Sequence, residues 1–164
     1  MRIISLFLTS IILLAVIGCG KKPEETLVEK AIQAQFGDNA KIEISEDSVS
    51  IKSEDGKALI TAGKGATIPK DFPSDIYVYP KSGVEATIDM PTGKMVTLIS
   101  SDDVGTIAAA YKKEMSSKGW KEQTSMNVEG QHVLILQKDE RAINITIIKD
   151  DKTGGSRIAL MMTQ

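Results

Sequence analysis

The sequence predicts an α+β protein: an antiparallel sheet with one helix packed on it, in the order ββαββββ, preceded by a smaller αβββ unit. Two observations predict this class. Short runs along the chain alternate apolar and polar residues, which is typical of strands with one buried side. Two other stretches repeat apolar residues every three or four positions, which is typical of amphipathic helices. Strands joined by short turns pair antiparallel, so we expect helices to cover one side of an antiparallel sheet.

The smaller unit is predicted over residues 24–62. Pro23 suits the start of a helix, and Gly37 suits its end. The apolar residues between them recur at helical spacing: Leu27, Val28, Ala31, Ile32 and Phe36. Alternating runs at 40–44, 49–51 and 58–62 then predict three strands, with Asp55-Gly56 as a hairpin turn.

Residues 63–83 contain Pro69, Pro73 and Pro80. Proline at these positions disfavours both a helix and a central strand. We therefore predict an extended connector, with one brief strand at Ile76–Tyr79.

The larger unit is predicted over residues 84–164. Alternation predicts strands at 84–90 and 95–99, joined by a turn at 91–94. Ser100-x-x-Asp103 fits a capping box, so a helix is expected to begin there. Its apolar stripe runs from Val104 to Met115, and Gly119 ends it. Four strands are then expected at 120–126, 131–138, 142–149 and 156–162.

The predicted strand 131–138 is apolar on both sides. Val133 and Ile135 point one way, while Leu134 and Leu136 point the other. A strand that is apolar on both sides is usually covered on both sides. We therefore expect the smaller unit, or a partner protein, to cover the second side.

The chain begins with a short basic segment and an apolar run at residues 3–17. Fifteen helical residues span about 22 Å, which is short for a bilayer core of about 30 Å. The sequence Val16-Ile17-Gly18-Cys19 follows. This pattern resembles the lipobox of bacterial lipoproteins, in which the cysteine is lipidated and the leader is removed. An ordinary signal peptide or anchor with an incidental cysteine is the alternative.

The lipoprotein resemblance implies residues 1–18 as a signal peptide, and residues 19–23 as a lipidated Cys19 with a short tether. The membrane would then be a partner through the lipid on Cys19, with the folded part facing the periplasm. Residue 20 is Gly and not Asp, which by the sorting rule of enteric lipoproteins favours the outer membrane over the inner one. The four residues 20–23 reach about 14 Å when extended, so we expect the protein to lie close to the membrane.

Composition excludes several kinds of site. The chain has one Cys and one His, so a structural zinc site, a disulfide framework and a Cys–His nucleophile are not expected. The net charge is −2, which gives no basic signal for nucleic acid. We predict no catalytic centre, no metal and no cofactor.

Aromatic residues are the best candidates for binding. Phe72, Tyr77 and Tyr79 lie close together in the connector, and Tyr side chains are good anchors for a ligand as well as good packing residues. Leu134 and Leu136 are further candidates, on the strand that is apolar on both sides.

Two stretches resemble a pattern in uncharacterised small envelope lipoproteins, over residues 70–162. They are the run DFPSDIYVYP and the end of the predicted helix, where Gly119-Trp120 follows. The resemblance implies a compact α+β domain and no activity.

Two functions fit these observations. The first is a non-catalytic interaction or scaffold module, anchored in the cell envelope, with an envelope protein as its partner. The second is a small binding lipoprotein for a lipid, glycan or peptide, using the region of Phe72, Tyr77 and Tyr79. A flat apolar sheet face would favour the first, and a deep pocket lined by these aromatic residues would favour the second.

Overall fold

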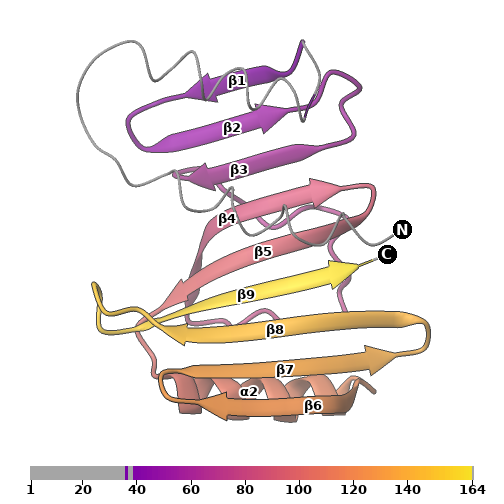
Figure 1. The fold of residues 1–164 in the computed structure, drawn as a ribbon, viewed down its shortest axis with the longest axis vertical. Helices are drawn as coiled ribbons and strands as arrows, with labels where there is room; N and C mark the ends of the chain where they lie inside the picture. The colour runs from indigo at the N-terminus through magenta and orange to yellow at the C-terminus, as the bar shows by residue number, and fades with distance from the viewer. Residues whose placement is uncertain (1–35, 37–38, 164) are drawn as a thin grey trace.

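A computed structural model describes residue 36 and residues 39–163 of the chain. These residues form a nine-stranded sheet in the order β1-β2-β3-β4-β5-β9-β8-β7-β6, in which every neighbouring pair is antiparallel (Figure 1). The first five strands are β1 (Lys41–Ile44), β2 (Ser48–Lys52), β3 (Leu59–Gly63), β4 (Ser82–Met90) and β5 (Gly93–Ser100). Helix α2 (Val104–Ser117) follows, and the remaining strands are β6 (Lys121–Val128), β7 (Gln131–Lys138), β8 (Arg141–Lys149) and β9 (Ser156–Thr163).

The α+β class is confirmed, but the predicted arrangement as two units is wrong. Strands β1 to β3 do not form a separate small unit, because β3 pairs with β4 through Ile60 and Ile88 and so extends the same sheet. The connector between β3 and β4 is long, which made a boundary look natural in the sequence. The pairing of β3 with β4 could not be predicted from the sequence, because the alternation of residues in a strand does not specify its neighbouring strand. The predicted helix over residues 24–36 lies outside the described residues, apart from Phe36.

Strand β9 is the central strand that joins the two parts of the sheet. It pairs with β5 on one side and β8 on the other, so strands far apart in the sequence become neighbours. The chain passes very close to itself at Gly93, where an added Cβ would lie 2.4 Å from the carbonyl oxygen of Met162. This contact, together with a positive φ of 156°, requires glycine at the start of β5.

Helix α2 begins at Val104, with Asp103 as its N-cap. The carboxylate of Asp103 accepts hydrogen bonds from the backbone N–H and the hydroxyl of Thr106, at 3.0 and 2.6 Å. The predicted capping box with Ser100 as the cap is therefore wrong by one turn. Ser100 instead ends β5, where its hydroxyl donates a hydrogen bond to the carbonyl oxygen of Lys81.

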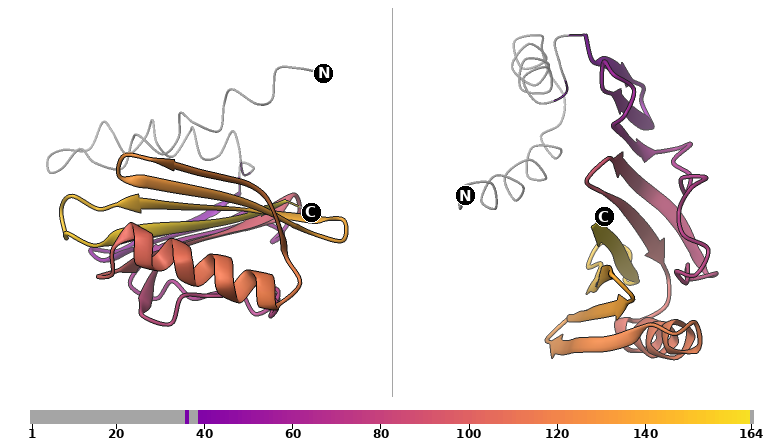
Figure 2. Two further views of the ribbon diagram at one scale, coloured as in Figure 1. Left: turned by 90° about the horizontal axis from the view of Figure 1, so that it is seen from below. Right: turned by 90° about the vertical axis from the view of Figure 1, so that its right-hand side faces the viewer.

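The hydrophobic core lies between α2, the connector and one side of β4 to β9. The left view of Figure 2 shows α2 and the connector on the same side of the sheet. Helix α2 contributes Ile107, Tyr111 and Met115, each fully buried, and these pack on side chains such as Ile145 and Leu160 of the sheet. Each such side chain stabilises the fold by about 1.5–3 kcal/mol when it leaves water.

Residues 64–81 form the connector between β3 and β4. They consist of turns and irregular backbone, so the brief strand predicted at Ile76–Tyr79 is wrong. The segment bends instead of extending because its backbone closes turns at Pro69 and Pro73, whose carbonyl oxygens accept from the N–H groups of Phe72 and Ile76. The connector therefore follows the surface of the core and supplies side chains to it.

Candidate functional site

Cys19, residues 1–18 and the tether 19–23 lie outside the described residues. Within the described part of the chain, no helix is long and apolar enough to cross a membrane. Among the same residues, no group of three or more His, Cys, Asp or Glu side chains is arranged to hold a metal ion.

Leu134 and Leu136, two candidate binding residues, are core residues with exposed fractions of 0% and 2%. Register explains their placement, because Leu134 pairs with Ile145 and Leu136 with Ile143, on the side that α2 covers. The side of β7 that α2 leaves uncovered carries Val133 and Ile135. The sequence could not assign the two sides, since both are apolar.

The connector aromatics pack on one another and on α2. The rings of Tyr77 and Tyr111 meet edge to face with centroids 5.3 Å apart, while Tyr79 and Tyr111 are stacked at 6.5 Å. Tyr79 is buried, and Phe72 and Tyr77 are partly buried against the core. These aromatic residues do not line either of two surface hollows. One hollow lies between the β2–β3 and β4–β5 turns, and the other lies beside Gly119.

The hydroxyl of Tyr79 donates a hydrogen bond to Asp102. This bond, with burial as the next cause, raises the pKa of Tyr79 to about 12. Burial also raises the pKa of Tyr111, whose hydroxyl has no hydrogen-bond partner among the described residues. The aromatic group thus holds the connector to the start and the middle of α2. A ligand-binding role for Tyr77 and Tyr79 would require this packing to open.

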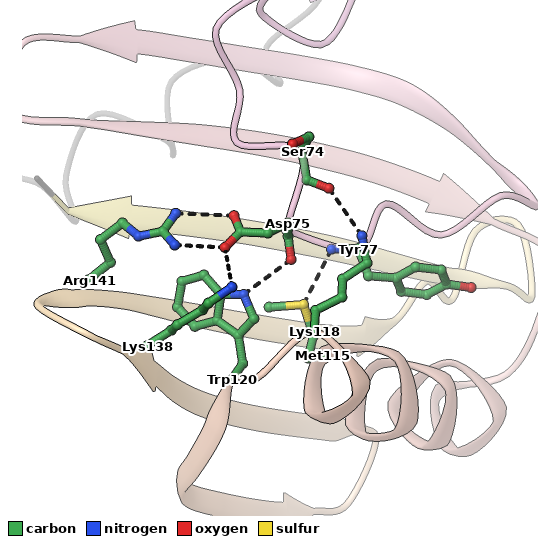
Figure 3. A network of polar contacts seen from close by, with 8 residues as sticks. All are labelled: Ser74, Asp75, Tyr77, Met115, Lys118, Trp120, Lys138 and Arg141. Carbon is green, nitrogen blue, oxygen red and sulfur yellow. Dashed lines mark hydrogen bonds and ion pairs between the residues drawn. The ribbon is translucent and has the colours of Figure 1, made fainter.

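A polar cluster that the sequence did not reveal fixes the connector a few residues before its aromatic group (Figure 3). The carboxylate of Asp75 accepts two hydrogen bonds from Arg141, at 2.6 and 3.1 Å, and one from Lys138, at 2.8 Å. The indole N–H of Trp120 donates to the backbone carbonyl of Asp75 at 3.1 Å, and the guanidinium of Arg141 lies 5.1 Å from the centre of the indole ring. We call these four residues, Asp75, Trp120, Lys138 and Arg141, the Asp75 clasp.

The hydrogen bonds from Arg141, followed by those from Lys138, hold the pKa of Asp75 well below its ordinary value. The carboxylate is therefore ionised throughout the physiological range. Bidentate Arg–carboxylate pairs have defined geometry as well as charge. The clasp is a structural tie between the connector and the β7–β8 hairpin, and the ionic groups of Asp75, Lys138 and Arg141 are paired within it.

Lys94 forms a second tie beneath the connector. Its side chain is 5% exposed, and its ammonium group is paired with Asp71 at 2.7 Å and with Asp89. Burial acts to lower the pKa of Lys94, but the hydrogen bonds to Asp71 and Asp89 outweigh it and raise the pKa. An ammonium group placed in this way is neutralised by its partners and stays protonated, so it is not a free base.

The other side of the sheet has a largely apolar surface, interrupted by a few polar residues. We call this side, which faces away from α2 and the connector, the open face. Two rows of cross-strand neighbours define it, each with one residue from every strand. The first row is Ile42, Ile51, Ile60, Ile88, Met95, Met161, Asn144, Ile135 and Thr124. The second row is Ile44, Val49, Ala62, Ala86, Thr97, Ala159, Thr146, Val133 and Met126.

Most of the large exposed apolar side chains of the described residues lie on the open face. Met126 is 50% exposed, Met161 is 40% exposed and Ile44 is 69% exposed. Val128 and Ile99 follow the same alternation, at 64% and 43%. Contiguous apolar surface of this kind is uncommon on a monomer and marks sites of contact. Strand alternation was the signal that could have found these residues, but the sequence did not say which side the helix would cover.

Charged groups lie at one end of the open face. Arg157 makes two hydrogen bonds to Glu85, at 2.6 and 2.8 Å, and lies 3.8 Å from Asp150. The Glu85 hydrogen bond is the first cause of the raised pKa of Arg157. A charged group that borders an apolar surface is typical of the rim of a protein contact.

The comparisons with known proteins concern one part of the chain. A family model described as START domain-like matches residues 81–155, from the end of the connector to the turn before β9. The chain is therefore similar to this family over a segment that lies within the 70–162 region of the envelope-lipoprotein resemblance. The comparison does not support the lipobox or lipoprotein resemblance. The searches of curated proteins and of solved structures found no match.

Proposed function

We propose that this protein is a non-catalytic interaction module of the cell envelope, held at the membrane by a lipid on Cys19. Its partner is an envelope protein, which binds the open face over β5 to β9. The single observation that carries the proposal is the exposed apolar side chains on that part of the open face, such as Met126, Val128 and Met161. An exposed apolar sheet face favours this function over a ligand pocket, because the connector aromatics are packed into the fold.

The chemistry of this surface describes the partner. The most exposed residues are unbranched methionines and β-branched residues, and methionine adapts its shape to irregular apolar surfaces. Arg157 and Glu85 border the surface and would align a partner that carries charges of both signs. Edge strand β6 is exposed along nearly its whole length, so a partner can also reach its unpaired backbone groups.

The membrane anchor adds proximity. A lipid on Cys19 would confine the protein to the membrane surface, and each buried CH₂ contributes about 0.8 kcal/mol to the anchoring. A partner in the same membrane then meets the open face at raised effective concentration. This argument supports a module whose intrinsic affinity is modest.

The test is in-cell crosslinking of the full-length protein, followed by affinity capture and mass spectrometry. Wild type is compared with M126S/M161S, with C19A and with a control variant, K113S/S116A, whose side chains are exposed on α2, on the opposite side of the sheet. We expect one protein partner to be captured by wild type and by the control. Capture should fall about tenfold for M126S/M161S, because two exposed apolar contacts are lost.

Two outcomes would overturn parts of the proposal. Undiminished capture by M126S/M161S would show that the open face is not the contact. Undiminished capture by C19A, with the protein still in the membrane fraction, would show that the lipid on Cys19 does not provide the anchor.

A further inference from the structure

The open face is most strongly apolar over β1 to β4. Four isoleucines form adjacent cross-strand pairs there: Ile42 with Ile51, Ile51 with Ile60, and Ile60 with Ile88. Pairs of β-branched side chains are favourable neighbours on a sheet, provided that the surface they form leaves water.

The opposite side of the same strands is mostly polar. On β2 it carries Ser48, Ser50 and Lys52, and on β3 it carries Thr61 together with one apolar residue, Leu59, which is 39% exposed. The hydrophobic side of β1 to β3 is therefore the reverse of the side that α2 and the connector cover over β4 to β9. The sheet changes its buried side along its width, so β1 to β3 require a covering layer on the open face.

The burial of one residue indicates such a layer. Ile51, in the middle of this group, is 9% exposed, whereas Ile44 at the edge is 69% exposed. Neither α2 nor the connector lies on this side of the sheet (Figure 2). Helix α2 and the connector therefore do not account for the burial of Ile51.

The position of Phe36 identifies the covering segment. Phe36 lines a hollow with Ala58 and Met90, and its carbonyl oxygen accepts a hydrogen bond from the N–H of Glu54 at 3.4 Å. Met90 is in phase with Ile88, so this hollow opens at the corner of the open face. Phe36 thus lies at the edge of the apolar surface of β1 to β4.

The length and pattern of that chain fit the surface. Residues 24–36 place Leu27, Val28, Ala31 and Ile32 on one side of a helix, and Thr26, Lys30 and Gln33 on the other. As a helix this segment is about 20 Å long. Four adjacent strands, spaced about 4.8 Å apart, form a surface about as wide as this helix is long when the outer side chains are included. We infer that residues 24–35 of this chain pack as an amphipathic helix on the open face over β1 to β4.

This inference does not depend on the proposed function, because the proposed partner surface lies over β5 to β9. It has a consequence for that surface, however. A helix of this length covers about half the width of the sheet and leaves Met126, Val128 and Met161 uncovered.

The test uses thiol labelling of Ile51→Cys in the full-length chain with C19A, so that the new thiol is the only one in the protein. Labelling by a water-soluble maleimide is measured in this background, with added L27S/I32S, and with the matched control T26S/Q33S. We expect slow labelling in the parent and in the control. Labelling should become about tenfold faster with L27S/I32S, because loss of two apolar contacts favours local opening.

Equal labelling rates in all three proteins would overturn the inference. So would protection of the introduced thiol that disappears on dilution, because that result assigns the surface to a second copy of the chain. Near-ultraviolet circular dichroism of Trp120 shows whether the core of each variant is intact. A variant with Thr61→Cys, on the polar side of β3, should label at a rate that L27S/I32S does not change.

Discussion

Asp75 is the residue on which the position of the connector most depends. Its side chain joins Arg141 and Lys138, and its backbone carbonyl joins Trp120, so one residue ties three elements together. We expect Asp75→Asn to lower the free energy of unfolding by about 1–2 kcal/mol, since two cations lose their carboxylate but remain partly hydrated. Chemical denaturation measures this change. The control Asp151→Asn removes a carboxylate that is 87% exposed and should change stability by less than about 0.5 kcal/mol.

The same residue gives the protein a specific acid sensitivity. The folded-state pKa of Asp75 is lower than its ordinary value of 3.8, first because of Arg141. Its contribution is therefore complete above that ordinary pKa and is lost as the pH falls below it. The stability difference between wild type and Asp75→Asn should shrink between neutral pH and about pH 2. A difference that stays constant with pH would show that the clasp acts through shape and not through charge.

At the scale of single elements, the N-cap of α2 offers a clear test. Asp103→Ala removes both hydrogen bonds to Thr106 and should cost about 1 kcal/mol of unfolding free energy. Asp103→Asn retains an acceptor and should cost a few tenths of that. Thermal unfolding followed by circular dichroism measures both. An equal loss for the two variants would mean that the charge of Asp103, and not its capping hydrogen bond, stabilises α2.

Individual elements were largely predictable from the sequence. The predicted strands at 84–90, 131–138, 142–149 and 156–162 lie close to β4, β7, β8 and β9, because their alternation is regular and turn residues bound them. The strand at Ile76–Tyr79 was predicted wrongly. Its aromatic and β-branched residues have high strand propensity, but tertiary packing against Met115 and Tyr111 decides their conformation.

The candidate site was less predictable than the elements. Leu134 and Leu136 were chosen because their strand is apolar on both sides, and a single sequence cannot say which side receives the helix. The Asp75 clasp joins residues 63 and 66 positions apart, and no local pattern signals such a pair. Val133, Ile135 and Met161 meet on one face through the pairing of β7 and β9 with β8, which only the fold reveals.

At the scale of the whole molecule, the core is concentrated in the later part of the chain. Its buried members run from Ile76 to Met162, and among the described residues Ile51 is the buried apolar side chain outside it. We expect residues 64–164 to fold cooperatively alone, with near-ultraviolet circular dichroism of Trp120 like that of the whole protein. Residues 19–63 alone should not fold, because three strands without β4 bury too little apolar surface. Cooperative unfolding of 19–63 would instead support an independent first domain.

The central position of β9 also determines when the protein can fold during its synthesis. Strands β5 and β8 are made earlier, but they acquire their shared neighbour only after Thr163 has left the ribosome. Until then Val96, Leu98 and Ile145 lack Ile158 and Leu160 beside them, and the middle of the sheet is open. A sheet completed by such a late, long-range pairing forms slowly. The nascent chain therefore cannot complete the middle of the sheet before residues 156–163 have been made, even though β5 and β8 are already present.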